Sequence, residues 1–574
     1  MRFRTCASLL LLSLSGLGRA SQDDPVDQIV RTQMTAQRIP GVAVAVVRRG
    51  EIVKSQGYGL ANVEHDVPVT DDLTIIALAN LAQAQPERIV NDIAAHYIPK
   101  LRETENWTIH GADVADGTGA PLQRVDVRVE GDTIREIGAI TPRPDDRRFD
   151  ATGLVVAPGF IDTHNHSTEG LDSDPDATTQ VSQGITTALL GQDGSSPFPV
   201  RDYLARRRSS PVALNVALLV GHATIRRQVM GNDFRREATA AEVSRMEGLV
   251  DQEMRDGAVG LSSGLEYEVG SYASTEELVA LARIAARHRG FYISHIRDEA
   301  DRTMEAVREA IAIGERARLP VQITHIKLGT VGVWGKALEV VALVEAARKR
   351  GADVTADAYP YLAWSSSLKV LVPNKQWTDP VSVKEALDDV GGGQNIQITR
   401  LPTFPQYVGK RLSEIAKAES ISEVDAYIRM VADDEAGVIG HTMSEADMRT
   451  FYRQPWTMVA SDGGVNVDHP RGAGTFPRVL GRFVRDEKWL TLPDAIRKMT
   501  SLPAARIGLK DRGIIRVGMK ADLVIFDPAT VLDRSTFEQP RLRARGIHSV
   551  FVNGKPVWTR DRPDGNRPGR VLQP

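Results

Sequence analysis

Two histidines close an apolar run in the first third of the chain. The run Val155-Val-Ala-Pro-Gly-Phe-Ile-Asp-Thr-His-Asn-His ends in His164 and His166. An apolar run of this kind predicts a buried β-strand, and residues i and i+2 of a strand point to the same face. Because imidazole is a common protein ligand for metal ions, two imidazoles at one strand end could form half of a metal site. A surface turn with two polar residues is the alternative, and the later sequence favours the metal site.

Three later strand-like runs also end in side chains that can bind metals. Gly290-Phe-Tyr-Ile-Ser-His295 and Pro320-Val-Gln-Ile-Thr-His325 end in histidine, and Thr457-Met-Val-Ala-Ser-Asp462 ends in a carboxylate. If these strands lie parallel in one sheet, their carboxyl ends meet at one edge. We therefore expect His295, His325 and Asp462 to lie near the first two histidines.

Eight strand-like runs, most of them separated by helical patterns, can position these residues. A capping box at Ser274-Thr-Glu-Glu277 predicts the start of one helix, and 303–319 and 335–349 have apolar residues at helical spacing. Strands that alternate with helices predict a parallel sheet, and eight such units predict an α/β fold of the (β/α)8 TIM-barrel type. The active site of such a barrel lies at the carboxyl ends of its strands. The eight runs are Gly159–His166, Gly184–Gly191, Val212–His222, Ala258–Tyr267, Gly290–Ile296, Val321–Leu328, Asp353–Tyr361 and Thr457–Gly463.

Alternating β patterns lie on both sides of the expected barrel, which spans residues 158–505. Val125-Asp-Val-Arg-Val129 and Thr133-Ile-Arg-Glu-Ile137 predict a hairpin, and a second turn is expected at Asn553-Gly554. We expect segments 104–157 and 506–574 to form one small flanking β-sandwich. Residues 369–435 lack an obvious strand–helix repeat, so we interpret them as an insertion over the mouth of the active site that could shape acyl-group preference.

From about residue 104 to the C-terminus, the chain resembles the D-aminoacylase (N-acyl-D-amino-acid deacylase) branch of the amidohydrolase superfamily. The first matching motif is common to the superfamily, whereas the Gly-Leu-Glu-Tyr and Ser-His-Ile-Arg-Asp-Glu motifs are more specific to this branch. The matching stretches are Ala157-Pro-Gly-Phe-Ile-Asp-Thr-His-Asn-His, Gly260-Leu-Ser-Ser-Gly-Leu-Glu-Tyr267, Ser294-His-Ile-Arg-Asp-Glu299, Thr324-His-Ile-Lys327, Ser461-Asp-Gly463, His469-Pro-Arg471 and Gly474-Thr-Phe-Pro-Arg478.

The resemblance implies a zinc-dependent hydrolase whose substrate is a small N-acylated D-amino acid. It places His164, His166 and Asp462 at one metal position and His295 and His325 at a second. It also implies that the substrate carboxylate is bound by Tyr267, Lys327 and Arg471. Two cations and a phenol suit a planar carboxylate, because they offer charge-assisted hydrogen bonds. A salt bridge at the rim, a surface charge and simple ring packing are the respective alternatives for Lys327, Arg471 and Tyr267.

One position departs from the family pattern. D-aminoacylases usually carry a cysteine at the end of the second strand, where this chain has Asp193. A carboxylate can bind zinc but is a harder ligand than a thiolate. Asp193 either replaces the cysteine at the second metal position or caps the next loop, so occupancy by one or two metal ions stays open. Glu266 is a further candidate ligand.

The mechanism expected for such a site assigns a proton-transfer role to Asp462. A zinc ion would activate a water molecule and polarise the scissile amide carbonyl. Asp462 could take the proton of the attacking water and pass it to the leaving amine. A purely structural ligand is the alternative for Asp462. His222, His441 and His469 are weaker candidates for contact with the substrate.

The first twenty residues predict a secretory signal peptide. Arg2 and Arg4 precede an apolar run, and Gly18-x-Ala20 offers small residues for cleavage. This run is too short for a stable membrane anchor, and we find no other segment long and apolar enough. We therefore expect an exported, periplasmic or secreted enzyme. Cys6 is the single cysteine, so the mature chain would contain neither disulfides nor thiol nucleophiles.

Residues from about 24 to 75 resemble the opening of the serine β-lactamase and penicillin-binding family. The run from Arg38 to Val53 resembles its first strands, but the Ser-x-x-Lys nucleophile motif expected after Thr74 is absent. Residues 21–103 are too few to complete that fold, so we interpret them as a non-catalytic segment. Ser366-Ser-Leu-Lys369 has the Ser-x-x-Lys form without a second supporting motif, and we interpret it as coincidence.

Composition is typical of a soluble globular enzyme with two or three domains. The 574 residues are 42% hydrophobic and carry a formal charge of −3, which becomes −6 after removal of Arg2, Arg4 and Arg19. This balance argues against a nucleic-acid partner, which needs a basic face. Two alternatives to the deacylase remain. One is another hydrolase of the superfamily, acting on a cyclic amide or a D-configured dipeptide, and the other is a metal-free binding protein.

Overall fold

The structure is a computed structural model that describes residues 25–37, 41–48, 51–62, 67–68, 106–143 and 146–573. The chain divides into two compact units, Met1–Thr104 and Glu105–Pro574. The predicted signal peptide and the stretch after Thr74 both lie outside the described residues. Each unit is described by itself.

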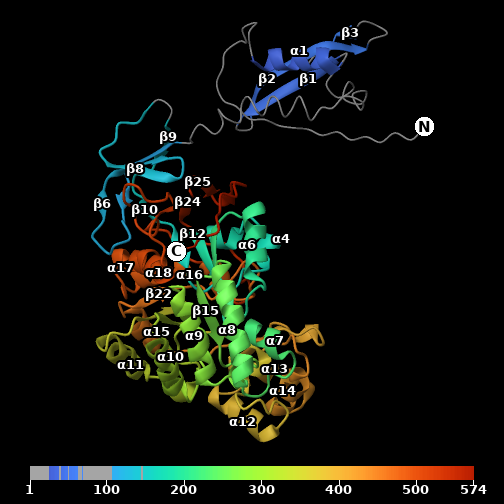
Figure 1. Cartoon of the computed structure of the whole chain (residues 1–574), viewed down its shortest axis with the longest axis vertical. Coiled ribbons are helices and arrows are strands. Elements are labelled where there is room, and N and C mark those ends of the chain that lie inside the picture. Colours follow the sequence, from blue (N-terminus) through green and yellow to red (C-terminus); the bar gives the residue numbers. More distant parts are fainter. Residues whose placement is uncertain are drawn as a thin grey trace, which may run out of the picture. The chain divides into compact units, whose positions relative to one another are not determined.

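The described residues of the first unit form one helix and a small antiparallel sheet (Figure 1). Helix α1 (Pro25–Gln37) precedes strands β1 (Gly41–Arg48), β2 (Glu51–Asn62) and β3 (Val67–Pro68). The sheet order is β1-β2-β3. The apolar run predicted as the first strand of this segment is thus β1.

Each of the eight strand-like runs of the larger unit contains a strand, and every pairing among these strands is parallel. They form a three-stranded sheet, β11-β12-β13, and a six-stranded sheet, β14-β15-β16-β17-β18-β22. A parallel bridge between Asn165 and Gly463 joins the segments that follow β11 and β22. Because the strands form two sheets, the α/β fold is confirmed and closure into one barrel stays a prediction. The strands are β11 (Phe160–Asp162), β12 (Ile185–Leu190), β13 (Asn215–Leu218), β14 (Val220–Gly221), β15 (Gly260–Gly264), β16 (Phe291–His295), β17 (Val321–Ile323), β18 (Val354–Ala358) and β22 (Thr457–Val459).

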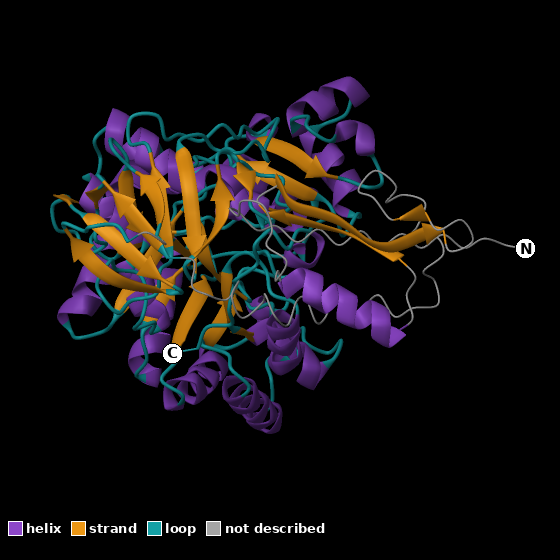
Figure 2. Ribbon diagram, turned by 90° about the horizontal axis from the view of Figure 1, so that it is seen from above, coloured by secondary structure: helices purple, strands orange, loops and turns teal. Residues whose placement is uncertain are grey.

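Helices lie around the outside of these strands (Figure 2). Their apolar residues recur at three- and four-residue spacing, as in α9, which buries Leu278, Leu281, Ala282 and Ala285. None of the helices in the described ranges is both long and apolar enough to cross a membrane. The main helices are α6 (Val200–Ser209), α7 (His222–Met230), α8 (Ala240–Arg255), α9 (Thr275–Arg287), α10 (Thr303–Ala317), α11 (Ala337–Lys349), α15 (Glu445–Tyr452), α16 (Arg471–Arg478), α17 (Leu492–Met499) and α18 (Ser501–Ile507).

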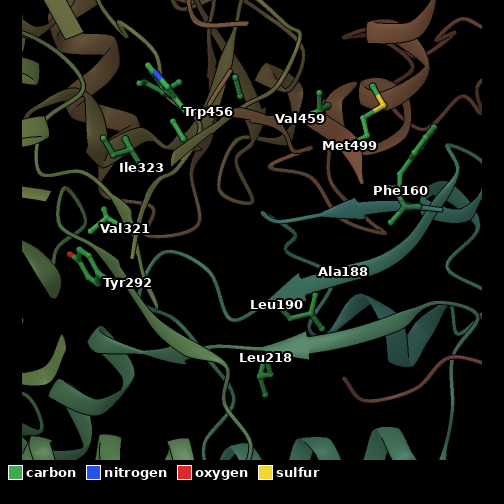
Figure 3. Packing of buried hydrophobic residues seen from close by; sticks show 14 of the residues in the cluster. Phe160, Ala188, Leu190, Leu218, Tyr292, Val321, Ile323, Trp456, Val459 and Met499 are labelled. Carbon is green, nitrogen blue, oxygen red and sulfur yellow. The ribbon is translucent and has the colours of Figure 1, made fainter. Parts of the chain in front are cut away.

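The largest hydrophobic core lies between the strands and the helices. Figure 3 shows Leu190, Tyr292 and Val459, which come from three different strands, within this core. Met499 of α17 and Trp456 contribute to it as well. Close packing of side chains from distant segments fixes where each strand ends, and therefore where the residues after it lie.

The predicted capping box of α9 forms only in part. The side chain of Ser274 accepts a hydrogen bond from the backbone N–H of Glu277, as expected. The Glu277 carboxylate does not return to the helix end, because it pairs with the buried side chains of His222 and Arg226. The distance from His222 Nε2 to Glu277 Oε1 is 2.8 Å. His222 is therefore a packed, hydrogen-bonded histidine of the core.

Strands from the two ends of the larger unit pair with one another. Strand β10 (Val155–Pro158) runs antiparallel to β23 (Leu523–Phe526) in a seven-stranded sheet. The predicted hairpin is present as β7 (Asp126–Glu130) and β8 (Thr133–Gly138), in a second, four-stranded sheet. A hydrophobic cluster contains residues of both sheets, such as Val127 and Ile525. The remaining strands are β4 (Trp107–His110), β5 (Asp113–Val114), β6 (Gln123–Arg124), β9 (Arg147–Asp150), β24 (Ile547–Val552), β25 (Lys555–Thr559) and β26 (Arg562–Pro563).

The expected turn at Asn553-Gly554 connects β24 to β25. Asn553 and Gly554 have φ angles of 47° and 78°. Positive φ at both central residues is typical of the two-residue turns that join antiparallel strands, and it explains the Asn-Gly pair. The antiparallel pairing of β10 with β23 confirms that the two terminal segments pair. Their assembly into a sandwich stays a prediction.

The segment interpreted as an insertion has a small hydrophobic core of its own. Strands β19 (Trp364–Ser367), β20 (Ile396–Arg400) and β21 (Gly437–Gly440) form an antiparallel sheet in the order β19-β21-β20. Helices α12 (Pro380–Asp389), α13 (Leu412–Glu419) and α14 (Glu423–Val431) gather at one end of the unit (Figure 1). This insertion segment, Trp364–Gly440, extends past the predicted bounds of 369–435 at both ends.

Removal of the Glu277 charge should destabilise the larger unit. The Glu277→Gln substitution leaves the buried Arg226 guanidinium without its carboxylate, and breaking a buried pair in this way costs about 3–5 kcal/mol. We expect a clear decrease in the thermal unfolding midpoint measured by calorimetry. Glu276→Gln is the matched control. Glu276 lies on the same helix as Glu277, and its ion pair with Arg316 of α10 is exposed. Equal midpoints for the two variants would contradict this account.

Candidate metal centre

The two histidines of the His-x-His motif lie directly after β11. Their Nε2 atoms are 3.1 Å apart, and the side chain of His164 is fully buried. The sequence predicted a strand-like run up to His166, but the strand ends at Asp162. The motif therefore lies in the loop that follows the strand. The loop is held by Asp162, whose Oδ1 accepts hydrogen bonds from the backbone N–H groups of Ser461 (2.9 Å) and His164 (3.3 Å).

Three further predicted residues converge on this pair. His295 Nδ1 lies 3.0 Å from His325 Nε2. Asp462 Oδ1 lies 3.2 Å from His166 Nε2 and 3.4 Å from His164 Nε2. The structure therefore brings together all five ligand-type residues predicted at the strand ends.

Asp193 also directs its carboxylate into this cluster. Its Oδ1 is 3.5 Å from His164 Nε2 and its Oδ2 is 3.4 Å from His166 Nε2. Oδ1 is buried and makes no hydrogen bond among the described residues. Of the two alternatives for Asp193, a metal ligand and a loop cap, the geometry favours the ligand.

Three of the converging residues have unusual backbone conformations. The φ angles of Asp193, His325 and Asp462 are 54°, 32° and 47°. A positive φ costs free energy for residues other than glycine, and such strain is concentrated at functional sites where the surrounding structure enforces it. The packing around these three loops therefore holds the donor atoms in place at some cost in stability.

The donor atoms form two groups that share one histidine. The first contains His164, Asp193, His325 and Asp462, and the second contains His295, Glu299 and His325, with all donor atoms of a group within 4.8 Å of one another. The sequence had assigned His325 to a separate position from His164 and Asp462. Glu299 was missed by the sequence analysis, although it lies four residues after His295 in the Ser-His-Ile-Arg-Asp-Glu motif.

Carboxylates on the outside of the cluster orient its imidazoles. His295 Nε2 is 2.8 Å from Glu266 Oε2, and His325 Nδ1 is 2.9 Å from Glu299 Oε1. Asp357 Oδ1 accepts a hydrogen bond of 2.7 Å from the backbone N–H of His325. When one ring nitrogen donates to a carboxylate, the other is left with a lone pair for a metal. Glu266, proposed from the sequence as a ligand, thus lies behind His295.

The electrostatics of the cluster favour a bound cation. Burial disfavours a charged imidazole, but hydrogen bonds to Asp193 and Asp462 outweigh burial and raise the pKa of His166 to about 10. Burial also opposes ionisation of Asp462, yet Arg471, His164 and His325 hold the pKa of this carboxyl well below its usual range. In His325, burial and the adjacent Lys327 lower the pKa to about 4. Ionised carboxylates thus surround nitrogen donors, and this arrangement fits a divalent metal ion.

The predicted carboxylate-binding residues lie in one cavity with the cluster. Tyr267, Lys327 and Arg471 line it together with His295, His325 and Asp462. Lys327 Nζ lies 2.5 Å from Glu299 Oε2, and Arg471 Nη1 lies 2.7 Å from Asp462 Oδ2. Both cations are buried, so neither is the rim salt bridge or surface charge considered as an alternative.

The other candidates from the sequence are not in the cluster. His469 is buried and its Nε2 donates to the carbonyl oxygen of Ala363, while His441 Nε2 lies 3.1 Å from Gln397 Oε1. Lys369 of the Ser-x-x-Lys stretch pairs with Asp434. That pairing supports the interpretation of the stretch as coincidence.

Comparison with known proteins identifies the family. Residues 147–558 match the Amidohydrolase family. A D-aminoacylase of Alcaligenes xylosoxydans xylosoxydans is 39% identical over 487 residues, which cover 80% of this chain and 96% of the relative. The chain belongs to the amidohydrolase family. An N-acyl-D-glutamate deacylase and an N-acyl-D-aspartate deacylase of the same organism are 38% and 36% identical to this amidohydrolase over 82% of its length, covering 97% and 95% of their own.

Solved structures give the same result. A D-aminoacylase that defines a novel subset of amidohydrolases matches with a TM-score of 0.75 and 39% identity, over 82% of this chain and 99% of the other. An N-acyl-D-glutamate deacylase from Bordetella bronchiseptica, complexed with zinc and a phosphonate mimic of the tetrahedral intermediate, matches with a TM-score of 0.75 and 36% identity, over the same shares of the two chains. A further D-aminoacylase structure concerns a binuclear metal centre. The resemblance noted in the sequence motifs is confirmed.

The N-terminal unit of this amidohydrolase has a different relationship. Residues 26–75 match the Beta-lactamase family. The match covers α1, β1, β2 and β3 and agrees with the similarity noted in the sequence.

Removal of the Asp193 carboxylate should weaken metal binding. We expect the Asp193→Ala variant to retain much less divalent metal per chain than the unmodified protein after dialysis, because a charged donor is removed from between three imidazoles. Elemental analysis of the purified proteins gives the metal content. Asp202→Ala, which removes an exposed carboxylate of α6, is the control. Unchanged metal content in Asp193→Ala would exclude Asp193 as a ligand.

Proposed function

We propose that this protein is a metal-dependent hydrolase that cleaves the amide bond of N-acyl-D-amino acids to a carboxylate and a free D-amino acid. The observation that carries the proposal is one cavity in which metal-type donors lie beside Lys327, Arg471 and Tyr267. A neutral cyclic imide lacks the free carboxylate that these two cations suit. We infer the D configuration of the substrate from the names of the three deacylase relatives.

We assign the metal positions to the converging donors. His164, Asp193, Asp462 and the adjacent His166 would hold one ion together with His325, which would be shared with a second position at His295. We propose zinc, because imidazole and carboxylate are both zinc ligands and a related deacylase was crystallised with zinc. When bound, such an ion supplies a water nucleophile at neutral pH and polarises the amide carbonyl.

Proton transfer in this reaction is assigned to a side chain of the protein. Asp462 is buried, is held ionised by Arg471, and lies within hydrogen-bond range of His166. We assign it the role of accepting a proton from the attacking water as the new C–O bond forms. It then returns this proton to the amide nitrogen as the C–N bond breaks. The immediate products are a carboxylic acid and a neutral amine. The acid then transfers its proton to the amine, which gives a carboxylate and an ammonium group, so atoms and charge balance.

Substrate orientation is assigned to the three carboxylate-binding residues. Lys327 and Arg471 are fixed by Glu299 and Asp462, so their positions are set before the substrate arrives. Preorganised donors lose little entropy on binding and hold the scissile bond at a defined distance from the ligand cluster. The Tyr267 ring lies tilted against the His295 ring, with 4.5 Å between ring centroids, and contributes its hydroxyl.

We infer that the two parallel sheets are arcs of one (β/α)8 barrel over residues 158–505, flanked by a β-sandwich from 104–157 and 506–574. A single residue separates β13 from β14, and the Asn165–Gly463 bridge links the other two edges. The shared hydrophobic cluster of the terminal sheets supports the sandwich. Every predicted ligand then lies at the carboxyl end of a barrel strand.

We also propose that residues 1–20 direct export and that the mature enzyme works in the periplasm or outside the cell. The basic start, the apolar run and the small residues before Ser21 support this assignment. The mass of the mature chain, which should begin near Ser21, tests it. We assign no catalytic role to residues 21–103.

Hydrolysis of matched enantiomers tests the proposed reaction. We expect the zinc-loaded protein to hydrolyse N-acetyl-D-methionine and to leave N-acetyl-L-methionine largely intact, with activity lost after exhaustive chelation and restored by zinc. The Asp462→Asn variant should lose on the order of 100- to 10,000-fold in kcat. Equal rates on both enantiomers, or full activity after chelation, would reject the proposal.

A second test concerns the substrate carboxylate. Tyr267→Phe removes a single hydroxyl, and a hydrogen bond to a charged group is worth roughly 1.5–3 kcal/mol, or about 10- to 150-fold in kcat/KM. We expect this loss for N-acetyl-D-methionine but little change for its uncharged carboxamide. The two substrates therefore serve as each other's controls, and an equal loss on both would place the hydroxyl elsewhere in the reaction.

A further inference from the structure

The cavity that contains the ligand cluster has a second wall of different character. Its second wall comes from the insertion segment Trp364–Gly440. The wall is mostly apolar, with Trp364, Val370, Leu371 and Val390, and it also carries the neutral hydroxyl side chains of Ser365 and Ser366. The Trp364 ring is fixed, because Nε1 donates to Gly329 O at 3.1 Å and to Thr442 Oγ1 at 2.8 Å.

The lysine and arginine side chains of this cavity lie beside the ligand cluster. Among the described residues, the lysine and arginine side chains that line it are Lys327 and Arg471. Both are already paired with carboxylates and are assigned above to the α-carboxylate of the substrate. A second carboxylate on the substrate would therefore meet no lysine or arginine on the insertion wall.

The insertion wall instead offers an acid. Asp389 is the last residue of α12, is half-buried and lines the cavity. Within the described part of the chain it has no recorded ion pair. Burial and the neighbouring carboxylates of Asp301 and Asp388 raise its pKa, which shows that negative charge is already disfavoured at this place. Another anion here would be repelled and poorly solvated.

We propose that the insertion wall, with Asp389 at its edge, selects substrates that carry a neutral apolar side chain and rejects those that carry a second carboxylate. This inference rests on the proposed deacylase function and makes it more specific. Near-equal identity to deacylases with different named substrates does not choose among them. The composition of the wall does choose among them, since its apolar surface stabilises an aliphatic side chain and the wall offers a carboxylate no cationic partner.

One nearby cation provides the strongest alternative. Lys375 lines an adjacent groove that shares Glu266 and Pro373 with the cavity. Its Nζ donates to Pro373 O at 3.3 Å and lies 5.6 Å from the centre of the Tyr272 ring. If this side chain turned toward the cavity, it could pair with an acidic substrate, so its contribution has to be tested.

The test compares kcat/KM for N-acetyl-D-methionine, N-acetyl-D-leucine, N-acetyl-D-glutamate and N-acetyl-D-aspartate on the zinc-loaded full chain. We expect the neutral substrates to be preferred on the order of 100-fold or more, as for sites that leave a polar group unpaired. Asp389→Lys should reduce the methionine-to-glutamate ratio at least roughly tenfold by increasing hydrolysis of the glutamate substrate. Asp388→Lys is the matched control, because Asp388 lies on the same helix, pairs with Lys384 and is largely exposed.

Three outcomes would overturn the inference. The first is a kcat/KM for N-acetyl-D-glutamate within tenfold of that for N-acetyl-D-methionine in the unmodified enzyme. The second is a ratio that Asp389→Lys and Asp388→Lys change equally. The third is glutamate hydrolysis that Lys375→Met abolishes while methionine hydrolysis persists. In each case the deacylase function survives, whereas hydrolysis of none of the four substrates would reject the function itself. Circular dichroism of each variant confirms its fold.

Discussion

The buried carboxylate of Asp162 holds together the two segments on which the metal centre depends. One oxygen accepts hydrogen bonds from the backbone of His164 and of Ser461, so the loop after the first parallel strand is joined to the loop after the last. Asp462 Nα donates in turn to the carbonyl oxygen of His164. These bonds form away from water, where an unpaired polar group would be costly, and they therefore leave the loops little freedom.

The charge arrangement of the site follows from this constraint. Carboxylates at Asp193, Glu299 and Asp462 are held ionised by imidazoles, Lys327 and Arg471, although burial opposes every one of these charges. Breaking such a network at one residue leaves its partners uncompensated. A divalent cation between the imidazoles would supply the positive charge that protons on the rings otherwise provide, so binding of the ion would be coupled to the integrity of the site.

The two walls of the cavity divide the work of substrate recognition. The carboxyl ends of the strands supply the ligand cluster and the cations, which depend on precise geometry and come from packed elements. The insertion segment supplies a mostly apolar wall with two serines and one acid, on a separate small core. If this segment selects the substrate, as proposed, a change in it would alter substrate preference without disturbing the donors. Three relatives are deacylases named for different substrates.

The sequence by itself determined the parallel α/β pattern, the hairpins, the family and five residues of ligand type that converge. Strand periodicity and the position of each such residue at a strand end are local properties. It missed Glu299, left two roles open for Asp193 and divided the histidines between metal positions differently. Those features depend on distances between loops that are far apart in the chain. Only the tertiary structure decided that Glu277 pairs with His222 and Arg226 rather than closing its own helix, and that Asp389 reaches the cavity. A side chain selects among partners by proximity and burial, and both are set by packing.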